Sequence, residues 1–347
     1  MKTIRIIAVC AIALLSLSSC KKSFLDVKPT DKITADVLFA SDAGVKAFVA
    51  NLYYQMPVED FAYDPMNGFH YNKVNPNNSA CSNWITTDDG IGSQRGDMGA
   101  YEWHAWWTEG YKLNNDINQY FGYIEGLDKT EAEKDAMRGE AWFIRGMTYF
   151  ALARRYGGVP IIDKVGDVNV STTIYVPRST EVKTWDYVID CFAKADTLLG
   201  DGDGTGRRAS KWVALAYKSR AALHAATTAK YWDKAPLSGE AVDLGYVGGF
   251  SAADADRYFD ICIDACQRII DSKQYELYGN LAPASKEVAI DQISKFFIDP
   301  ASYKESIFIK GYSKDECVAM KDGNSTKFRI TWRTKKNLGK LRNKNVK

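Results

Sequence analysis

Residues 138–162 read RGEAWFIRGMTYFALARRYGGVPII, an apolar run that carries four arginines. Apolar side chains fall on most faces of the helix that this run predicts, which is typical of a helix buried among other helices. Arg154 and Arg155 lie in the last turn, where cations stabilise the negative end of the helix dipole. We expect Gly157 or Gly158 to supply the left-handed residue of a C-cap, and the following proline prevents the helix from resuming.

The other two arginines of the run, Arg138 and Arg145, are seven residues apart and share one face of the predicted helix. A phosphate or carboxylate clamp is one interpretation of such a pair. Ion pairing with acids on neighbouring helices is the interpretation that we favour. The run is therefore expected to be part of the scaffold.

Helical periodicity recurs along most of the chain. We expect helices over residues 36–56, about 101–124, 130–156, 185–199, 210–228 and 254–273. The helix that begins at Ser210 is rich in alanine, which lets neighbouring helix axes approach closely. Helices with large side chains alternate with helices rich in small side chains. This pattern predicts a mainly α fold that is built as a tetratricopeptide-like scaffold of helical pairs. Residues 57–100 lack this period and are rich in Gly, Asn and Asp, so we expect a long irregular loop there.

The first twenty residues resemble a secretory signal, with a basic start, about a dozen apolar residues and a small-residue cleavage site. They end in Leu-Ser-Ser-Cys20, which looks like a bacterial lipobox. In such a sequence the cysteine is lipidated and becomes the first residue of the mature chain. We therefore expect Cys20 to anchor the protein to a membrane, since more than one acyl chain makes attachment stable.

Charge and cysteine content exclude several classes of protein. The formal net charge of +2 gives no case for nucleic acid as a partner. Cys262 and Cys266 share a helix face, but zinc would need two further ligands and no histidine has suitable spacing. We therefore expect buried thiols, no metal and no cofactor. The widely spaced cysteines outside the signal and lipobox are Cys81, Cys191, Cys262, Cys266 and Cys317.

Catalytic motifs are also missing from the sequence. There is no Gly-x-Ser-x-Gly and no His-Glu-x-x-His. Residues 201–206, DGDGTG, imitate half of an EF-hand, but Trp212 stands where calcium requires a glutamate. We interpret this stretch as a plain loop between two helices.

The most informative feature of the sequence is a stretch that is rich in aromatic residues. Residues 53–123 hold four of the nine tryptophans. Trp106 belongs to a core stripe, whereas Trp107 and Tyr111 lie on the flank of the same predicted helix and are expected to be half-buried. Trp84 lies in a polar loop, where an exposed indole can stack on a sugar while an amide and acids take the hydroxyl groups. Trp232 is a further candidate platform. The glycan-binding residues that we predict are Asn83, Trp84, Asp88, Asp89 and Trp103.

The order of several loose motifs resembles the SusD/RagB lipoproteins. Cys20 is followed, after two lysines, by Ser-Phe-Leu-Asp-Val-Lys-Pro-Thr at 23–30, and Trp107-x-x-x-Tyr111-x-x-x-Asn115-x-Ile117 fits the family pattern, with Trp106 and Asn114 as alternative registers. The run quoted above resembles the family's most recognisable segment. Two shorter matches are Val-Pro-Arg-Ser-Thr at 176–180 and Ser-Ile-Phe at 306–308.

This resemblance implies a SusD-like α-α superhelix on the outer membrane of Bacteroidota-type bacteria. It implies a surface lipoprotein without catalytic residues that binds glycans and lids a SusC-like TonB-dependent transporter. We expect a signal at 1–19, a SusD-like N-terminal domain at 20–280 and the start of a truncated C-terminal region at 281–347, because the basic end of the chain does not resemble the family. A scaffold that binds only proteins is the alternative, and a glycoside hydrolase is the third.

Overall fold

The computed structural model describes residues 35–57, 62–64, 68–70, 106–167, 169–171, 175–204, 206–279, 282–296 and 304–309. The chain divides into two compact units, Met1–Asn51 and Leu52–Lys347. Within the described residues, every helix is too short or too polar to cross a membrane.

The first unit contains α2 (Ala35–Phe39) and most of α3 (Asp42–Gln55). The single helix expected over 36–56 is wrong, because the helix is interrupted before Asp42. Ser41 begins the second helix: its hydroxyl accepts a hydrogen bond from the Gly44 N–H at 3.1 Å. Serine favours such a cap over a helix interior, since its side chain competes for backbone groups. The rings of Phe39 and Phe48 then pack across the break, with centroids 5.0 Å apart.

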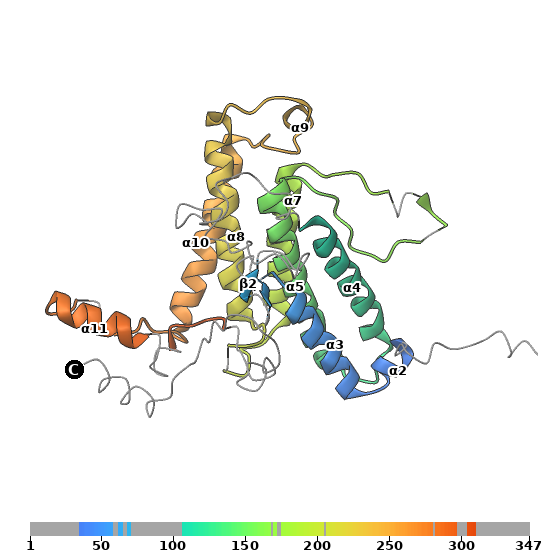
Figure 1. Ribbon diagram of the computed structural model, residues 1–347, viewed down its shortest axis with the longest axis horizontal. Coiled ribbons are helices and arrows are strands. Elements are labelled where there is room, and N and C mark those ends of the chain that lie inside the picture. The colour runs from blue at the N-terminus through green and yellow to red at the C-terminus, as the bar shows by residue number, and fades with distance from the viewer. Residues whose placement is uncertain are drawn as a thin grey trace, which may run out of the picture. The chain divides into compact units, whose positions relative to one another are not determined.

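The second unit is mainly helical (Figure 1). Its helices are α4 (Trp107–Gly126), α5 (Glu131–Tyr156), α7 (Glu181–Leu198), α8 (Lys211–Tyr231), the 3-10 turn η5 (Trp232–Lys234), α9 (Glu240–Asp243), α10 (Ala252–Ser272) and α11 (Lys286–Phe296). The expected irregular loop also contains a short antiparallel hairpin of β1 (Ala62–Asp64) and β2 (Gly68–His70). The prediction of a mainly α fold is confirmed. The prediction of an irregular loop over residues 57–100 is wrong at this hairpin.

The central helix α5 begins where the sequence predicts. Thr130 and Glu133 form a capping box, in which the Glu133 carboxylate accepts from the Thr130 N–H at 2.9 Å. The second half of α5 is buried on nearly all sides, as expected from its apolar faces. Ser210 likewise caps α8, because its hydroxyl accepts from the Val213 N–H. Local side-chain chemistry thus sets the start of both helices.

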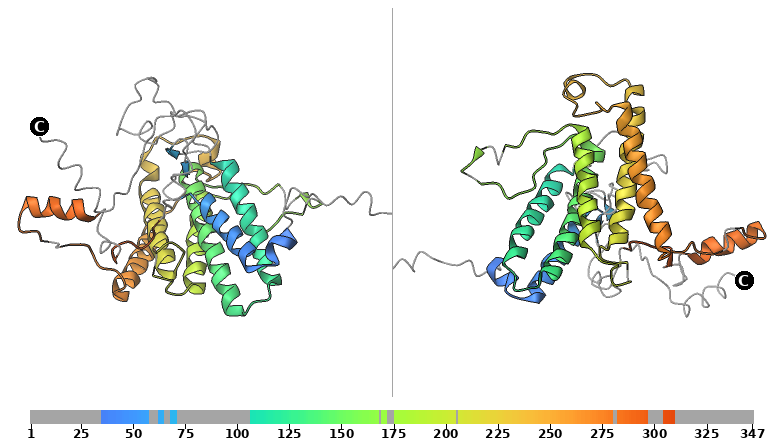
Figure 2. Two further views of the ribbon diagram at one scale, coloured as in Figure 1. Left: turned by 60° about the horizontal axis from the view of Figure 1, so that its bottom comes forward. Right: turned by 180° about the vertical axis from the view of Figure 1, so that it is seen from behind.

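Neighbouring helices pack in sequence order, α4 on α5, α5 on α7, α7 on α8 and α8 on α10 (Figures 1 and 2). Small residues permit this close packing. A Cβ atom on Gly146 of α5 would lie 2.7 Å from the ring of Phe192 on α7, so no larger residue fits without movement. Most alanines of α8, including Ala221 and Ala225, are fully buried. The expected helical pairs with small residues at their contacts are confirmed.

A hydrogen-bond network around Glu140 lies at the end of the bundle where α5 and α8 begin. The buried carboxylate of Glu140 accepts two hydrogen bonds from Arg208, at 2.8 and 2.6 Å. It also accepts one from the Tyr53 hydroxyl at 3.0 Å. The Ala209 N–H donates to the same hydroxyl at 2.8 Å, so three distant segments meet at one acid.

Candidate functional site

The opposite end of the bundle, which we call the loop end, gathers the starts of α4, α7 and α10 and the ends of α5 and α8. Hydrogen bonds join these segments directly. The Trp106 N–H donates to the Tyr156 hydroxyl at 2.9 Å, and the Trp232 indole N–H donates to the Phe250 carbonyl at 3.1 Å. Segments far apart along the chain therefore meet at one end of the bundle.

The two glycines that end α5 shape this surface. Gly157 has the positive φ that was expected, +66°, but its ψ of −123° lies outside the left-handed helical region. Its N–H donates to the Ala153 carbonyl and ends the helix. A Cβ atom on Gly157 would lie 2.3 Å from the Tyr246 carbonyl oxygen. Gly158 does not have a positive φ, but its Cβ would lie 2.1 Å from the Ser179 carbonyl oxygen. Both positions need glycine, the first for conformation and the second for space.

Residues 157–164, which we call the strap, then run across α4 and α5. The Tyr111 hydroxyl donates to the Pro160 carbonyl at 2.7 Å, and the Asn114 amide donates to the Ile162 carbonyl at 2.7 Å. The Ile162 N–H donates to the Tyr149 hydroxyl at 2.8 Å. Burial raises the pKa of the Tyr111 hydroxyl, which therefore stays protonated as a donor. Asn114, and not Asn115, is the buried register of the sequence motif.

Arg178 fixes the end of α5 from outside the helix. Its guanidinium donates to the carbonyls of Gly158 at 2.7 Å and Tyr156 at 2.6 Å, which are orphan acceptors at a helix end. The same guanidinium lies 4.8 Å from the ring centroid of Tyr246. This arginine belongs to the Val-Pro-Arg-Ser-Thr motif, for which the sequence predicted no role.

Glu181 positions the loop that carries Tyr246. Its carboxylate is buried and accepts from the Gly248 N–H at 2.6 Å and from the Trp185 indole at 3.2 Å. Burial raises the pKa of this carboxyl, and the two hydrogen bonds only partly offset that effect. The ring of Trp232 rests on Gly248, where a Cβ would approach it to 2.3 Å. Trp232 is thus half-buried and packed on one side.

Half-buried aromatic rings line this end, and we call them the aromatic ladder: Trp107, Tyr111, Tyr156 and Tyr246. The Trp107 ring lies 5.0 Å from Tyr111 and 5.1 Å from Tyr156, centroid to centroid. Arg178 links Tyr156 to Tyr246. The expectation that Trp107 and Tyr111 are half-buried is confirmed. Rings that expose part of a face beside polar groups can stack on a flat, hydroxyl-rich ligand.

The site residues predicted from sequence cannot be placed against the ladder. Cys20, Asn83, Trp84, Asp88, Asp89 and Trp103 lie outside the described residues. The ladder itself was missed because Arg178 and Tyr246 are distant in sequence from Trp107. Its signal in the sequence is the aromatic-rich stretch at 53–123, which contains Trp107 and Tyr111. Trp106 is buried in the core, as predicted.

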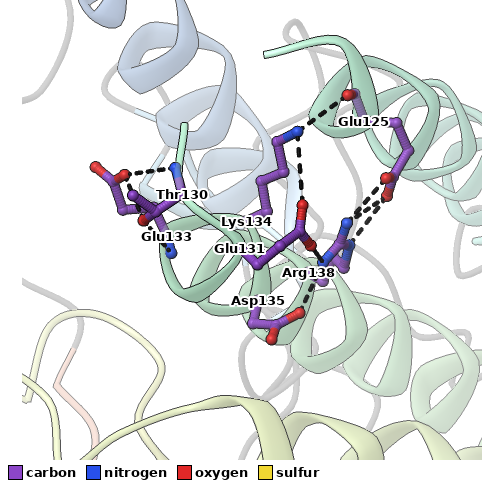
Figure 3. A network of polar contacts seen from close by, with 7 residues as sticks. All are labelled: Glu125, Thr130, Glu131, Glu133, Lys134, Asp135 and Arg138. Atoms are coloured by element: carbon purple, nitrogen blue, oxygen red, sulfur yellow. Dashed lines mark hydrogen bonds and ion pairs between the residues drawn. The ribbon is translucent and has the colours of Figure 1, made fainter. Parts of the chain in front are cut away.

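Arg138 lies in an ion-pair network away from the loop end (Figure 3). It forms hydrogen-bonded ion pairs with Glu125 of α4 at 2.8 Å and with Asp135 of its own helix at 2.7 Å. Lys134 donates to the Glu125 carbonyl and pairs with Glu131. The expected pairing with a neighbouring helix is therefore confirmed for Arg138.

The same expectation is wrong for Arg145. This side chain is 1% exposed, and its guanidinium donates to the side-chain oxygen of Asn118 on α4. Its charge faces the rings of Phe121 and Trp142, at 4.7 and 4.8 Å from the centroids. Among the described residues, an amide and two aromatic faces contact this cation in place of an acid. The amide nitrogen of Asn118 donates to the strap, at the carbonyls of Ile162 and Lys164.

Residues 201–204 and 206 belong to the connection between α7 and α8. Gly202, Gly204 and Gly206 have positive φ. Asp201 pairs with Lys211 at 2.7 Å, and this hydrogen bond lowers the pKa of the Asp201 carboxyl. In the part of the chain that the structure describes, His, Cys, Asp and Glu side chains form no metal-binding group of three or more.

Fold and loop end together define a scaffold of antiparallel helical pairs of the tetratricopeptide-like class. Residues 23–223 match the SusD-like family described as starch-binding and associating with the outer membrane. This match covers more than half of the chain, which therefore belongs to the SusD-like family. The resemblance seen in the sequence motifs is confirmed.

Individual relatives are more distant. The SusD-like protein P2 of Formosa agariphila is 27% identical over 114 residues, 33% of this chain and 22% of the relative. The crystal structure of a SusD-like protein from Bacteroides fragilis is similar with a TM-score of 0.53 and 22% identity, over 83% of this chain and 48% of that one. A SusD-like carbohydrate-binding protein from the same species has a TM-score of 0.46 and 15% identity, over 71% of this chain and 43% of that one. The chain spans less than half the length of these proteins.

Proposed function

We propose that this protein captures glycans and that the aromatic ladder at the loop end contributes to sugar binding. The observation that carries the proposal is the group of half-buried rings around Trp107, held in place by Arg178 and the strap. A platform of this kind needs no reorganisation before a sugar ring stacks on it, which limits the entropic cost of binding. The family's description as starch-binding supports the ligand class.

The residues predicted from sequence belong to the same proposal. Trp103 precedes Trp107 by four residues, and the polar loop of Asn83, Trp84, Asp88 and Asp89 belongs to the same aromatic-rich stretch. We propose that these side chains supply further sugar contacts. No catalytic role is proposed for the acids, because a glycosidase requires two carboxyl groups set across a cleft.

Delivery of the glycan is the second half of the proposed function. We propose that Cys20 carries a lipid that holds the protein on the outer membrane, and that a SusC-like TonB-dependent transporter receives the ligand. The lipobox supports the anchor, and the family's description as associating with the outer membrane supports the location.

Affinity electrophoresis of the full chain through gels that contain different neutral polysaccharides tests the proposal. Retardation by at least one polysaccharide, without release of reducing ends, is the expected result. Lack of retardation together with co-purification of protein partners would favour a scaffold that binds only proteins. Release of sugar products would indicate a glycoside hydrolase.

A further inference from the structure

Helix α10 carries two thiols that the glycan-binding function does not use. Cys262 and Cys266 are free, half-buried and one helical turn apart. Residues four apart on a helix share one face, so the Cys262 and Cys266 side chains are neighbours on α10. We expected both to be buried, as Cys191 is, but each retains access to solvent. The pair therefore presents two sulfur atoms side by side near the surface.

The helix makes a disulfide between these residues unfavourable. Residues four apart on a helix have Cβ atoms about 5–6 Å apart, whereas a disulfide requires about 3.5–4.5 Å. Two metal–sulfur bonds of about 2.3 Å, arranged in line, hold two sulfur atoms up to ~4.6 Å apart. The spacing of the pair suits a bridging metal atom better than a direct sulfur–sulfur bond.

The number of ligands selects the kind of metal. Zinc in a structural site takes four ligands, and across the described ranges no other His, Cys, Asp or Glu joins the two thiols in a metal-binding group. Thiolate ligands select soft ions, of which Cu(I) is the physiological example that accepts two ligands. Exposed apolar side chains flank the pair on α10, with Ile263 63% and Ile270 67% exposed, and they supply no competing oxygen ligand.

We propose that Cys262 and Cys266 bind one soft, two-coordinate metal cation of the Cu(I) class. Each thiol loses its proton when its sulfur bonds to the metal, so one bound ion releases two protons and the oxidation state of the metal does not change.

Competition with a chromophoric Cu(I) chelator tests this site in the full chain, reduced and kept free of oxygen. The wild-type chain should take one equivalent of Cu(I) from the chelator. The Cys262→Ser and Cys266→Ser variants should each bind Cu(I) at least tenfold more weakly and leave this equivalent on the chelator. In weakly buffered solution, the wild-type chain should release two protons per ion at this site.

The matched control moves one thiol without changing the number of cysteines. A variant with Cys266→Ser and Gln267→Cys places the second thiol five residues from the first, on a different face of α10. Gln267 is exposed, so thermal melts should match the wild type. This variant should lose the tightly bound equivalent. Equal Cu(I) binding by the shifted variant, or no tight equivalent in the wild-type chain, would overturn the proposal.

Discussion

The carboxylate of Glu181 accepts a hydrogen bond from the backbone N–H of Gly248 at 2.6 Å, although the two residues are 67 positions apart. This contact ties the first turn of α7 to the loop that carries Tyr246. This buried acid therefore helps to position the loop end. The burial of the Glu181 carboxyl makes the free energy of unfolding depend on pH.

We expect the free energy of unfolding of the Glu181→Gln variant to differ most from that of the wild type at low pH. Because burial raises the folded-state pKa of Glu181, its contribution to stability is fully present below its ordinary pKa of about 4.5 and is lost as pH rises through the folded value. At low pH the hydroxyl oxygen of the protonated carboxyl can still accept the second of the two hydrogen bonds from Gly248 and Trp185, whereas the amide nitrogen of glutamine cannot, which costs about 1–3 kcal/mol. Urea denaturation at several pH values should show the difference in unfolding free energy shrinking as pH rises. A constant difference would contradict the raised pKa.

Gly157→Ala should lower the free energy of unfolding by about 1–3 kcal/mol, since φ +66° is strained for alanine and its Cβ meets the Tyr246 carbonyl. Gly122→Ala on α4 is the control, because a Cβ there has no neighbour within 4 Å. That substitution should stabilise slightly, through the higher helix propensity of alanine. Thermal melts of both variants check this, and equal effects would show that the Gly157 conformation is not strained.

Substitution of Arg138 and of Arg145 by alanine should lower the free energy of unfolding by different amounts. Arg138→Ala breaks a partly exposed network and should cost no more than about 1 kcal/mol, with a smaller effect in 1 M salt. Arg145→Ala removes a buried side chain packed on Phe121 and Trp142 and leaves Asn118 without its donor. We expect a loss of about 3–5 kcal/mol, from the cavity left by a large buried side chain and from the buried Asn118 oxygen left without a donor. Equal costs in denaturant titrations would argue against this difference.

Cys20→Ala should release the protein from membranes without changing its thermal midpoint, because the proposed lipid, and not the folded body, provides the attachment. Membrane fractionation of cells that express the full chain measures the effect. Wild-type protein in the same cells is the control. A variant that stays in the outer-membrane pellet after a salt wash would show that something other than Cys20 lipidation holds it.

Much of the helical scaffold could be predicted because its signals are local. Thr130 and Ser210 cap their helices through residues three positions away, and Gly157 ends α5 within its own turn. The start of α7 was predicted four residues late, because its apolar stripe begins at Trp185, whereas Thr180 caps the helix by accepting a hydrogen bond from the Lys183 N–H. Hydrophobic periodicity alone does not show such a contact.

The loop end was harder to predict because its geometry depends on long-range partners. Arg178 lies in a motif that is visible in the sequence, yet its acceptors belong to residues 20 and 22 positions earlier. Arg145 was expected to pair with an acid, but the structure places it against Asn118 and two rings. Charge type predicts a class of partner, whereas tertiary packing decides which partner is present.

The central claim, glycan binding at the aromatic ladder, is tested most directly by calorimetric titration of Trp107→Ala with the polysaccharide that retards the wild-type chain. Trp212→Ala is the matched control, because Trp212 is also half-buried but lies at the start of α8, at the other end of the bundle. Stacking of an aromatic ring on a sugar should contribute roughly 1–3 kcal/mol, by analogy with base stacking. We expect about tenfold weaker binding for Trp107→Ala and unchanged binding for Trp212→Ala, with both variants folded by thermal melt. Wild-type affinity in a folded Trp107→Ala variant would contradict the account.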